Sequence, residues 1–276
     1  MEVVDLESKL KSLELFLSRL EGALVAYSGG VDSALLAEVA HKVLGPRSLA
    51  VTADSPSIPR RELVEAKSFA ASRGWRHLVV TTSELDDDRY VANPIDRCYW
   101  CKSALMDRLL PIAAAEGSSI LLGTNLDDLS DHRPGQAAAV AAGALQPMVE
   151  AELTKADVVA AARLLGMKVA DKPAAACLAS RFAYGVSVSA DGLKRVEKAE
   201  EWLNDNGFAV ARVRDLGADR ARVEVPEGDI PRLSDMKASL STLLVELGFA
   251  SVEIDPDGYR RGALNEGLIA LTSKPR

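Results

Sequence analysis

The residues best suited to chemistry form the string SGGVDS at positions 28–33, between an apolar run and a helical pattern. Two glycines allow a tight turn that exposes backbone N–H groups, and the N-terminus of the following helix adds about half a positive charge. A turn of this kind binds anions, above all phosphates. The hydroxyls of Ser28 and Ser33 can add hydrogen-bond donors to it.

Asp32 lies inside this turn, where a bare carboxylate would repel a phosphate. A Mg²⁺ ion that bridges Asp32 to the phosphate oxygens removes the repulsion, because Mg²⁺ prefers oxygen ligands. No lysine follows the glycines, so the string is not a Walker loop. The competing interpretation is an ordinary tight turn capped by a serine, which two glycines alone would also produce.

Three cysteines form the second candidate site. Cys98 and Cys101 make a C-x-x-C pair at the start of a helical pattern, and Cys177 follows in a distant segment. Three thiolates suit an iron–sulfur cluster that leaves one iron open to an external sulfide. Zinc with His132 as fourth ligand and a thioredoxin-like redox pair are the alternatives. The spacing alone does not separate these sites from three unrelated buried thiols.

The elements that must position these motifs follow from the apolar pattern. Runs typical of buried strands occupy residues 23–27, 48–53, 77–82 and 119–124. Helical patterns lie at residues 1–20, 33–45, 59–74, 101–117 and 154–166, the last with a capping-box pattern of Thr154 and Asp157. The alternation predicts an α/β fold with a doubly wound parallel sheet. Its ligands would bind at the carboxyl ends of the strands, at residues 28–33, 53–59 and 123–128.

After residue 184 the pattern changes to helix, strand, strand, helix, strand. These elements are expected at residues 191–206, 211–216, 221–226, 230–247 and 251–255. The order predicts a smaller C-terminal α+β domain, and therefore two domains at residues 1–184 and 185–276. The length of 276 residues agrees with about two domains.

Composition and charge exclude several classes of protein. Hydrophobic residues make up 48% of the chain and charged residues 26%, which is the balance of a soluble globular protein. A net charge of −7 without a basic domain argues against a nucleic-acid partner. No apolar run approaches the roughly 20 residues of a membrane span, and the first residues do not resemble a signal peptide. We therefore expect a cytoplasmic protein with reduced thiols.

Several strings together resemble a known family. SGGVDS is similar to the PP-loop of the ATP pyrophosphatase superfamily, which has an adenine nucleotide alpha hydrolase-like fold and cleaves ATP between the α and β phosphates. Further strings are NPIDRCYWCK (93–102), GTNLDDLSDHRPG (123–135), EAELTKADV (150–158), KPAAACLASRFAYG (172–185) and GYRRGALN (258–265). With them, nearly the whole chain resembles the LarE-type ATP-dependent sulfur transferases. GTNLDD and the segment around Cys177 are more specific than the shared PP-loop.

The resemblance implies an activity. LarE-type enzymes adenylate carboxylates of pyridinium-3,5-biscarboxylic acid mononucleotide with ATP and Mg²⁺, and convert them into thiocarboxylates for the nickel-pincer cofactor. In one branch a single cysteine, which matches Cys177, gives up its sulfur and becomes dehydroalanine. The additional Cys98 and Cys101 match the three-cysteine branch and imply a [4Fe–4S] cluster with an extra sulfide. Sulfide or another sulfur donor is then a partner, and the resemblance implies a homo-oligomer, a hexamer.

The resemblance also implies the roles of individual residues. The ATP phosphates and Mg²⁺ are assigned to Ser28, Gly29, Gly30, Asp32 and Ser33. Adenosine is expected to bind beside Ala53, Asp54 and Ser55. The end of the next strand in the site is expected to be lined by Gly123, Thr124, Asn125 and Asp128. Arg181 is expected to neutralise the charge that develops on the acyl-adenylate near Cys177. Lys102 and Arg133 are weaker candidates for the same role, and a surface position is the alternative for Arg181.

Arg212 and Arg214 alternate along a predicted strand, so both side chains point to one face. Such a pair suits the phosphate of the substrate through bidentate contacts. The alternative of equal weight is a solvated strand face, because acidic residues such as Asp215 and Glu224 are interleaved with the arginines.

Other functions compete with sulfur transfer to a small molecule. A tRNA thiolation enzyme shares the PP-loop and can carry three cysteines, but the net charge of −7 argues against it. A non-enzymatic nucleotide-binding regulator would not need a C-x-x-C pair and a third distant cysteine. An amidating ligase would need a glutaminase-like domain, and the sequence shows none.

Overall fold

The computed structural model describes residues 2–130, 134–173 and 176–260. Backbone contacts divide the chain into two compact units, Met1–Asp87 with Asp96–Ala175, and Asp88–Ile95 with Ala176–Arg276. The chain therefore leaves the first unit after Asp87 and returns to it at Asp96. The sequence interpretation placed residues 88–95 and 176–184 in the first domain, whereas their contacts group them with the second unit. A boundary between folding domains at residue 185 stays a prediction.

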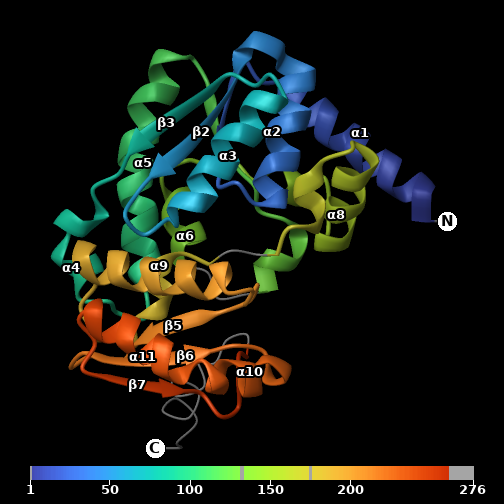
Figure 1. The fold of residues 1–276 in the computed structure, drawn as a ribbon. Coiled ribbons are helices and arrows are strands. Elements are labelled where there is room, and N and C mark those ends of the chain that lie inside the picture. Colours follow the sequence, from blue (N-terminus) through green and yellow to red (C-terminus); the bar gives the residue numbers. More distant parts are fainter. Residues whose placement is uncertain (1, 131–133, 174–175, 261–276) are drawn as a thin grey trace, which may run out of the picture. The chain divides into compact units, whose positions relative to one another are not determined.

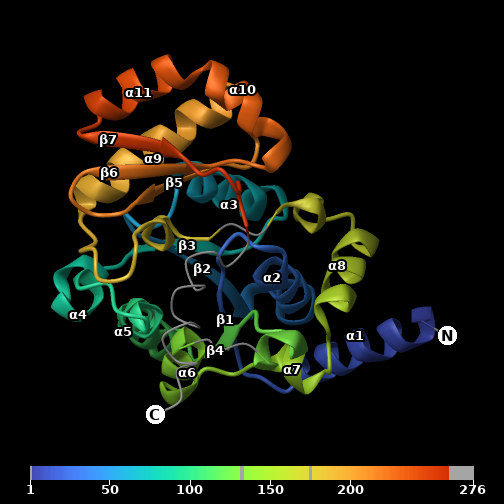
Figure 2. The same ribbon diagram turned by 90° about the horizontal axis from the view of Figure 1, so that it is seen from below.

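A four-stranded parallel sheet forms the centre of the first unit, in the order β3-β2-β1-β4 (Figure 2). Its strands are β1 (Ala23–Ala26), β2 (Ser48–Asp54), β3 (His77–Thr81) and β4 (Ser119–Leu122). Ala23 of β1 lies opposite Ser48 of β2 on one side and Ser119 of β4 on the other. The predicted doubly wound parallel sheet and its four strands are confirmed.

Helices cover both faces of this sheet (Figures 1 and 2). They are α1 (Glu2–Ser18), α2 (Val31–Leu44), α3 (Arg60–Ser72), α5 (Arg97–Ala115), α6 (Pro134–Ala141), α7 (Pro147–Glu150) and α8 (Lys155–Leu164). Val25 packs into a core with α1, α2 and α8, while the adjacent Leu24 packs into a second core with α5 and α6. Alternate residues of one buried strand thus serve two hydrophobic cores, which explains why β1 reads as a continuous apolar run.

Two details of the first unit differ from the sequence interpretation. Helix α5 begins at Arg97 rather than at residue 101, so both members of the C-x-x-C pair lie within its first five residues, and Pro111 lies inside it. The short helices α6 and α7 were not predicted. Each begins with a proline, which suits the first position of a helix because that residue needs no intrahelical N–H partner.

The second unit contains a three-stranded sheet in the order β5-β6-β7. Its strands are β5 (Arg212–Asp215), β6 (Arg220–Glu224) and β7 (Ser251–Ile254), and its helices are α4 (Asp88–Val91), α9 (Ala190–Asp205), α10 (Ile230–Asp235) and α11 (Lys237–Glu246). Strand β6 is antiparallel to β5 and parallel to β7. Figure 2 shows α9, α10 and α11 beside this sheet. The predicted order of elements is confirmed, except that the helix expected at 230–247 is interrupted at Met236.

Among the described residues, no helix combines the length and the apolarity that crossing a membrane would require.

The predicted capping box of α8 is confirmed. The Thr154 hydroxyl accepts a hydrogen bond from the backbone N–H of Asp157 at 3.2 Å, and the Asp157 carboxylate accepts one from the N–H of Thr154 at 3.0 Å. Each side chain thus satisfies a backbone donor that the helix itself leaves without a partner. This cap fixes the first turn of α8, where Lys155 is located.

Replacing Thr154 with alanine removes this cap. We expect Thr154→Ala to lower the free energy of unfolding by about 1 kcal/mol, because one helix N–H loses its acceptor. Thr154→Ser, which keeps the hydroxyl, serves as the matched control and should lose much less. Urea unfolding followed by circular dichroism measures the difference. Equal losses in the two variants would show that the hydroxyl does not carry the cap.

Candidate active site

The SGGVDS turn connects β1 to α2 and is held in shape by its own serines. The Ser33 hydroxyl donates to the carbonyl oxygen of Gly30 at 3.2 Å and accepts from the N–H of Ser28 at 3.1 Å. The hydroxyls of Ser28 and Ser33 lie 3.0 Å apart. Gly29 has a φ of 80°, a backbone conformation that side chains disfavour. The first N–H groups of α2 have no intrahelical acceptor, so the preformed turn is suited to bind an anion.

The end of β4 runs directly against this turn. A Cβ atom on Gly123 would lie 2.7 Å from both the backbone N and the Cα of Ser33, so only glycine fits there. The close approach brings Asn125 beside Asp32, and the Asn125 amide donates to Asp32 Oδ1 at 3.0 Å. Asn125 is itself buried and exchanges two hydrogen bonds with Asp128, at 3.1 and 3.2 Å. Residues expected from two separate strand ends therefore meet at Asp32.

Lys155 is a residue of this site that the sequence interpretation missed. Its ammonium Nζ lies 2.5 Å from Asp32 Oδ2, and its backbone N–H donates to the Asp127 carboxylate at 2.8 Å. A signal was present, because a lysine in the first turn of a helix opposes the helix dipole and needs an anionic neighbour. The Asp32 carboxylate thus already binds a positive charge in the SGGVDS turn. A charged oxygen ligand at this position fits the Mg²⁺ expected there.

The loop after β2, where adenosine was expected, is held by contacts within the protein. Arg60 pairs with the Asp54 carboxylate and also donates to the carbonyl oxygen of Ser55. The Ser55 hydroxyl donates to the carboxylate of Glu84, which is 1% exposed, and accepts from the N–H of Ser57 at 3.0 Å. The side chains of Asp54 and Ser55 therefore shape the loop, and their contact with adenosine stays a prediction.

The cysteines lie in both units. In the first unit, Cys98 is exposed and Cys101 half-buried, both within the first five residues of α5. In the second unit, Cys177 is half-buried. None of the three forms a disulfide, and among the described residues no three histidine, cysteine or acidic side chains form a metal site. Burial lowers the pKa of Lys102, while the charges of the neighbouring Cys101 and Cys98 act in the opposite direction. His132 and Arg133 lie outside the described residues.

The loop that carries Cys177 is fixed by Arg181. The Arg181 guanidinium is buried and binds both carboxylate oxygens of Glu200, each at 2.9 Å. It also donates to the carbonyl oxygens of Ala176 at 2.8 Å and Cys177 at 3.1 Å. Burial alone would lower the pKa of Arg181, but the paired Glu200 raises it above its usual value. Arg181 is therefore not a surface residue, and it clamps the backbone on both sides of the Cys177 side chain to α9.

Arg214 is the inner member of the predicted arginine pair. Its guanidinium binds both carboxylate oxygens of Glu224, at 2.9 and 2.7 Å, and donates to the carbonyl oxygen of Ser180 at 2.9 Å. Arg214 is 6% exposed and Glu224 4%, so this part of the strand face is not solvated. The positive charge of Arg214 is therefore balanced inside the protein.

Arg212 has a different environment on the same strand face. It stacks on the ring of Tyr259, with the guanidinium carbon 5.3 Å from the ring centroid, and donates to the carbonyl oxygen of Ala211 at 2.7 Å. Within the described part of the chain, no carboxylate lies within ion-pair distance of it. Burial, together with the neighbouring charge of Arg181, lowers the pKa of Arg212. Of the two arginines, Arg212 therefore has the charge that an anionic ligand could compensate.

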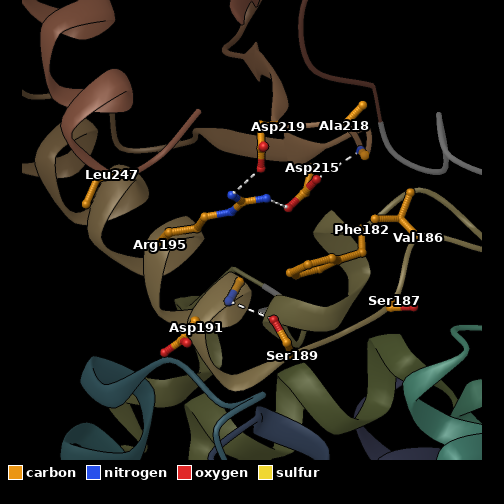
Figure 3. Close-up of a pocket in the computed structure, with 12 residues that line it drawn as sticks. Phe182, Val186, Ser187, Ser189, Asp191, Arg195, Asp215, Ala218, Asp219 and Leu247 are labelled. Carbon is orange, nitrogen blue, oxygen red and sulfur yellow. Dashed lines mark hydrogen bonds and ion pairs between the residues drawn. The ribbon is translucent and has the colours of Figure 1, made fainter. Parts of the chain in front are cut away.

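A pocket of about 540 Å³ lies elsewhere in the second unit, between the N-terminus of α9 and the turn after β5 (Figure 3). Arg195 extends across it and pairs with Asp215 at 2.5 Å and with Asp219 at 3.0 Å. Ser189 caps α9 by accepting from the N–H of Gly192 at 3.1 Å. None of the site residues that the sequence predicted lines this pocket. The charge of Arg195 is already balanced by the carboxylates of Asp215 and Asp219.

Comparison with known proteins covers nearly the whole chain. The chain is 36% identical over 265 residues to the pyridinium-3,5-bisthiocarboxylic acid mononucleotide synthase of Lactiplantibacillus plantarum. The aligned region covers 95% of this chain and 96% of that protein. The chain is also 43% identical over 266 residues to an uncharacterized protein of Synechocystis sp., across 95% and 99% of the two chains. An uncharacterized protein of Methanocaldococcus jannaschii is 28% identical over 238 residues, across 86% and 90%. No protein-family model matches the chain.

The two arginines of β5 should differ sharply in their effect on stability. Arg214→Ala leaves the buried Glu224 carboxylate without its partner, so we expect it to lower the free energy of unfolding by about 3–5 kcal/mol. Arg212→Ala leaves no buried carboxylate behind and should cost about 1 kcal/mol. Urea unfolding compares the two variants. As a further control, the Arg214→Met, Glu224→Leu double variant should recover much of the loss, and similar losses for both single variants would contradict the assignment.

Proposed function

The chain belongs to the LarE-type family of ATP-dependent sulfur transferases, and we propose that it converts carboxylates of pyridinium-3,5-biscarboxylic acid mononucleotide into thiocarboxylates for the nickel-pincer cofactor. The observation that carries this proposal is the similarity, over almost its entire length, to a synthase whose name states that product. The preformed phosphate loop with Asp32, Asn125 and Lys155 supports it, because the reaction requires ATP.

In the first step, the protein would activate a carboxylate of the substrate. A carboxylate oxygen attacks the α-phosphorus of ATP, the bond to the β-phosphate oxygen breaks, and pyrophosphate leaves with that electron pair. The N–H groups of the SGGVDS turn and the N-terminus of α2 would bind the phosphates. Asp32 would hold Mg²⁺, which neutralises phosphate charge when bound. Lys155 would then exchange its contact with Asp32 for a contact with a phosphate oxygen, so the site keeps its charges paired in both states.

In the second step, a sulfide attacks the carbonyl carbon of the acyl-adenylate. The bond to the AMP oxygen breaks, so AMP leaves, the thiocarboxylate forms, and the proton of the sulfide goes to solvent. Cys98, Cys101 and Cys177 would hold a [4Fe–4S] cluster, which would supply the sulfide if an additional sulfide ion were bound to its open iron. Three reduced thiols are the donor set that such a cluster with one open iron needs.

Arg181 and Arg212 would prepare the second unit for this chemistry. Arg181 donates to the carbonyl oxygens of Ala176 and Cys177, and would thereby hold the backbone that carries the thiol. The guanidinium of Arg181 is paired with Glu200, so its charge is already balanced within the protein. A direct role of Arg181 at the acyl-adenylate therefore stays a prediction. Arg212, whose charge has no carboxylate partner among the described residues, would bind the phosphate of the mononucleotide substrate. Arg214 would support it from the same strand face.

The first test concerns Asp32. We expect Asp32→Ala to lower ATP–pyrophosphate exchange, measured with the pyridinium dicarboxylate mononucleotide, by about 100-fold or more, because the phosphate charge loses its metal. Circular dichroism should show an intact fold. Asp171→Ala, which removes an exposed carboxylate of the same unit paired with Arg163, should leave the exchange unchanged. Undiminished exchange in Asp32→Ala would remove this residue from the nucleotide site.

The second test concerns the source of sulfur. If three thiolates hold one cluster, then Cys98→Ala, Cys101→Ala and Cys177→Ala should each lose iron and sulfur transfer, while adenylation survives in all three. Iron and sulfide analysis, and counting of turnovers with added sulfide, measure this under anaerobic conditions. If Cys177 were instead a sacrificial donor, only Cys177→Ala would lose transfer. A single turnover that leaves dehydroalanine at position 177, detected by mass spectrometry, would contradict the cluster.

A further inference from the structure

A pocket of about 280 Å³ lies in the first unit, and nothing in the proposed reaction uses it. Helix α3 lines it on one side, and the short helix Lys168–Asp171 that follows α8 lines it on another. Gly29 of the SGGVDS turn also contributes to the lining, so the pocket adjoins the backbone of that turn. The volume is close to the lower end of the range for small-molecule sites, which suits a ligand with a single ring.

Apolar side chains provide much of the wall. Phe69 and Ala66 contribute from α3, and Val169 contributes from the segment after α8. Ala66 and Val169 are buried, whereas Phe69 is half-buried. The Phe69 ring makes an edge-to-face contact with Trp75, with the ring centroids 5.5 Å apart. A flat apolar group that enters the pocket would therefore meet a preformed surface.

Tyr27, which follows β1, lines the same pocket and carries a buried hydroxyl. The residue is 2% exposed, and among the described residues its hydroxyl has no hydrogen-bond partner. The ring is held edge-to-face by Trp75 at 5.3 Å and by His77 at 5.8 Å between centroids. A buried hydroxyl without a partner is costly, so a group of this kind points to a missing water or ligand.

The hydroxyl of Tyr27 remains a hydrogen-bond donor. Burial raises the pKa of Tyr27, and the charge of Glu62 raises it further. The phenol is therefore protonated at neutral pH, and it can donate to an oxygen or nitrogen acceptor. An acceptor is what the pocket does not supply from its described residues.

The charged groups around the pocket compensate one another. Lys172 pairs with Glu62 at 2.6 Å and with Glu65 at 2.8 Å. Burial lowers the pKa of Lys172, but the two carboxylates outweigh it and raise the pKa above its usual value. With the exposed Lys168, the two lysines balance the two glutamates. A charged ligand would disturb this balance, so a neutral ligand is favoured.

We propose that this pocket binds a neutral, single-ring molecule that carries a hydrogen-bond acceptor, either a carbonyl oxygen or a ring nitrogen. The ring would pack on Phe69 and Val169, and the acceptor would receive the hydroxyl hydrogen of Tyr27. The inference goes beyond the proposed function and does not depend on it. Of the residues that line the pocket, only Gly29 was assigned to ATP, and none to the substrate or the sulfur.

The test uses benzamide, a neutral ring with a carbonyl acceptor, and the full chain. A titration followed by ligand-observed NMR measures the dissociation constant, and we expect saturable binding in the millimolar range. Tyr27→Phe removes only the hydroxyl and should weaken this binding roughly fivefold, because one hydrogen bond is lost. Tyr184→Phe, which removes a hydroxyl in the second unit, is the matched control and should bind benzamide as the parent does.

Two further probes test the chemical class of the ligand. Toluene keeps the ring but lacks the acceptor, and it should bind roughly fivefold more weakly than benzamide. Benzoate keeps the ring and the acceptor but adds a negative charge, and it should also bind more weakly than benzamide. Urea unfolding of Tyr27→Phe supplies an independent readout. Its midpoint should not fall, because the hydroxyl has no partner among the described residues to lose.

Each contrary result would overturn the inference. Without saturable benzamide binding, the pocket is not a site for this class of ligand. Equal affinity in the parent and in Tyr27→Phe would remove the hydroxyl from the site. A lowered urea midpoint of Tyr27→Phe with unchanged affinity would show that a water within the fold satisfies the hydroxyl. Tighter binding of benzoate than of benzamide would identify an anion site instead.

Discussion

The buried ion pair between Arg181 and Glu200 is the interaction on which the arrangement of the second unit depends. Removing two charges from water is costly, and the cost is offset only where the geometry is good and the remaining donors and acceptors are satisfied. Both conditions hold here, because the pair is bidentate and Glu200 also accepts the N–H of Val213 at 3.0 Å. One pair thereby joins the loop of Cys177, helix α9 and strand β5.

Charge compensation also organises the first unit. Asp32, at the N-terminus of α2, is held by the amide of Asn125 and the ammonium of Lys155, which come from the end of β4 and the start of α8. The same logic accounts for Arg214, which is balanced by Glu224, and distinguishes it from Arg212. In our proposal, the ATP phosphates bind to the N–H groups of the loop after β1, and an anionic group of the substrate binds beside Arg212, which stacks on Tyr259 rather than pairing with a carboxylate of the described residues.

The sequence predicted those features that depend on neighbouring residues. The four strands of the first unit, the glycine-rich turn at residues 28–33 and the capping box of α8 all follow from local patterns, and the structure contains them. The partners of Lys155 and Asn93 could not be predicted in this way, because their hydrogen bonds join residues 123 and 90 positions apart. The interruption at Met236 was missed for a different reason, since neither glycine nor proline marks it. The pairing of Arg214 with Glu224 depends on strand register, which the pattern of charges did not reveal.

The path of the chain through the two units has a consequence for dissecting the protein. Because Asp88–Ile95 belongs to the second unit while the residues on either side belong to the first, no single cut yields two complete halves. The buried amide of Asn93 donates to the carbonyl oxygens of Phe182, Ala183 and Val186. A fragment ending near residue 175 would retain Asn93 but lack these carbonyl groups, and a fragment starting there would lack Asn93. Each would expose buried polar groups without partners. A chimera that takes its second unit from a relative would therefore need both stretches of that unit, residues 88–95 and 176–276, from the same relative.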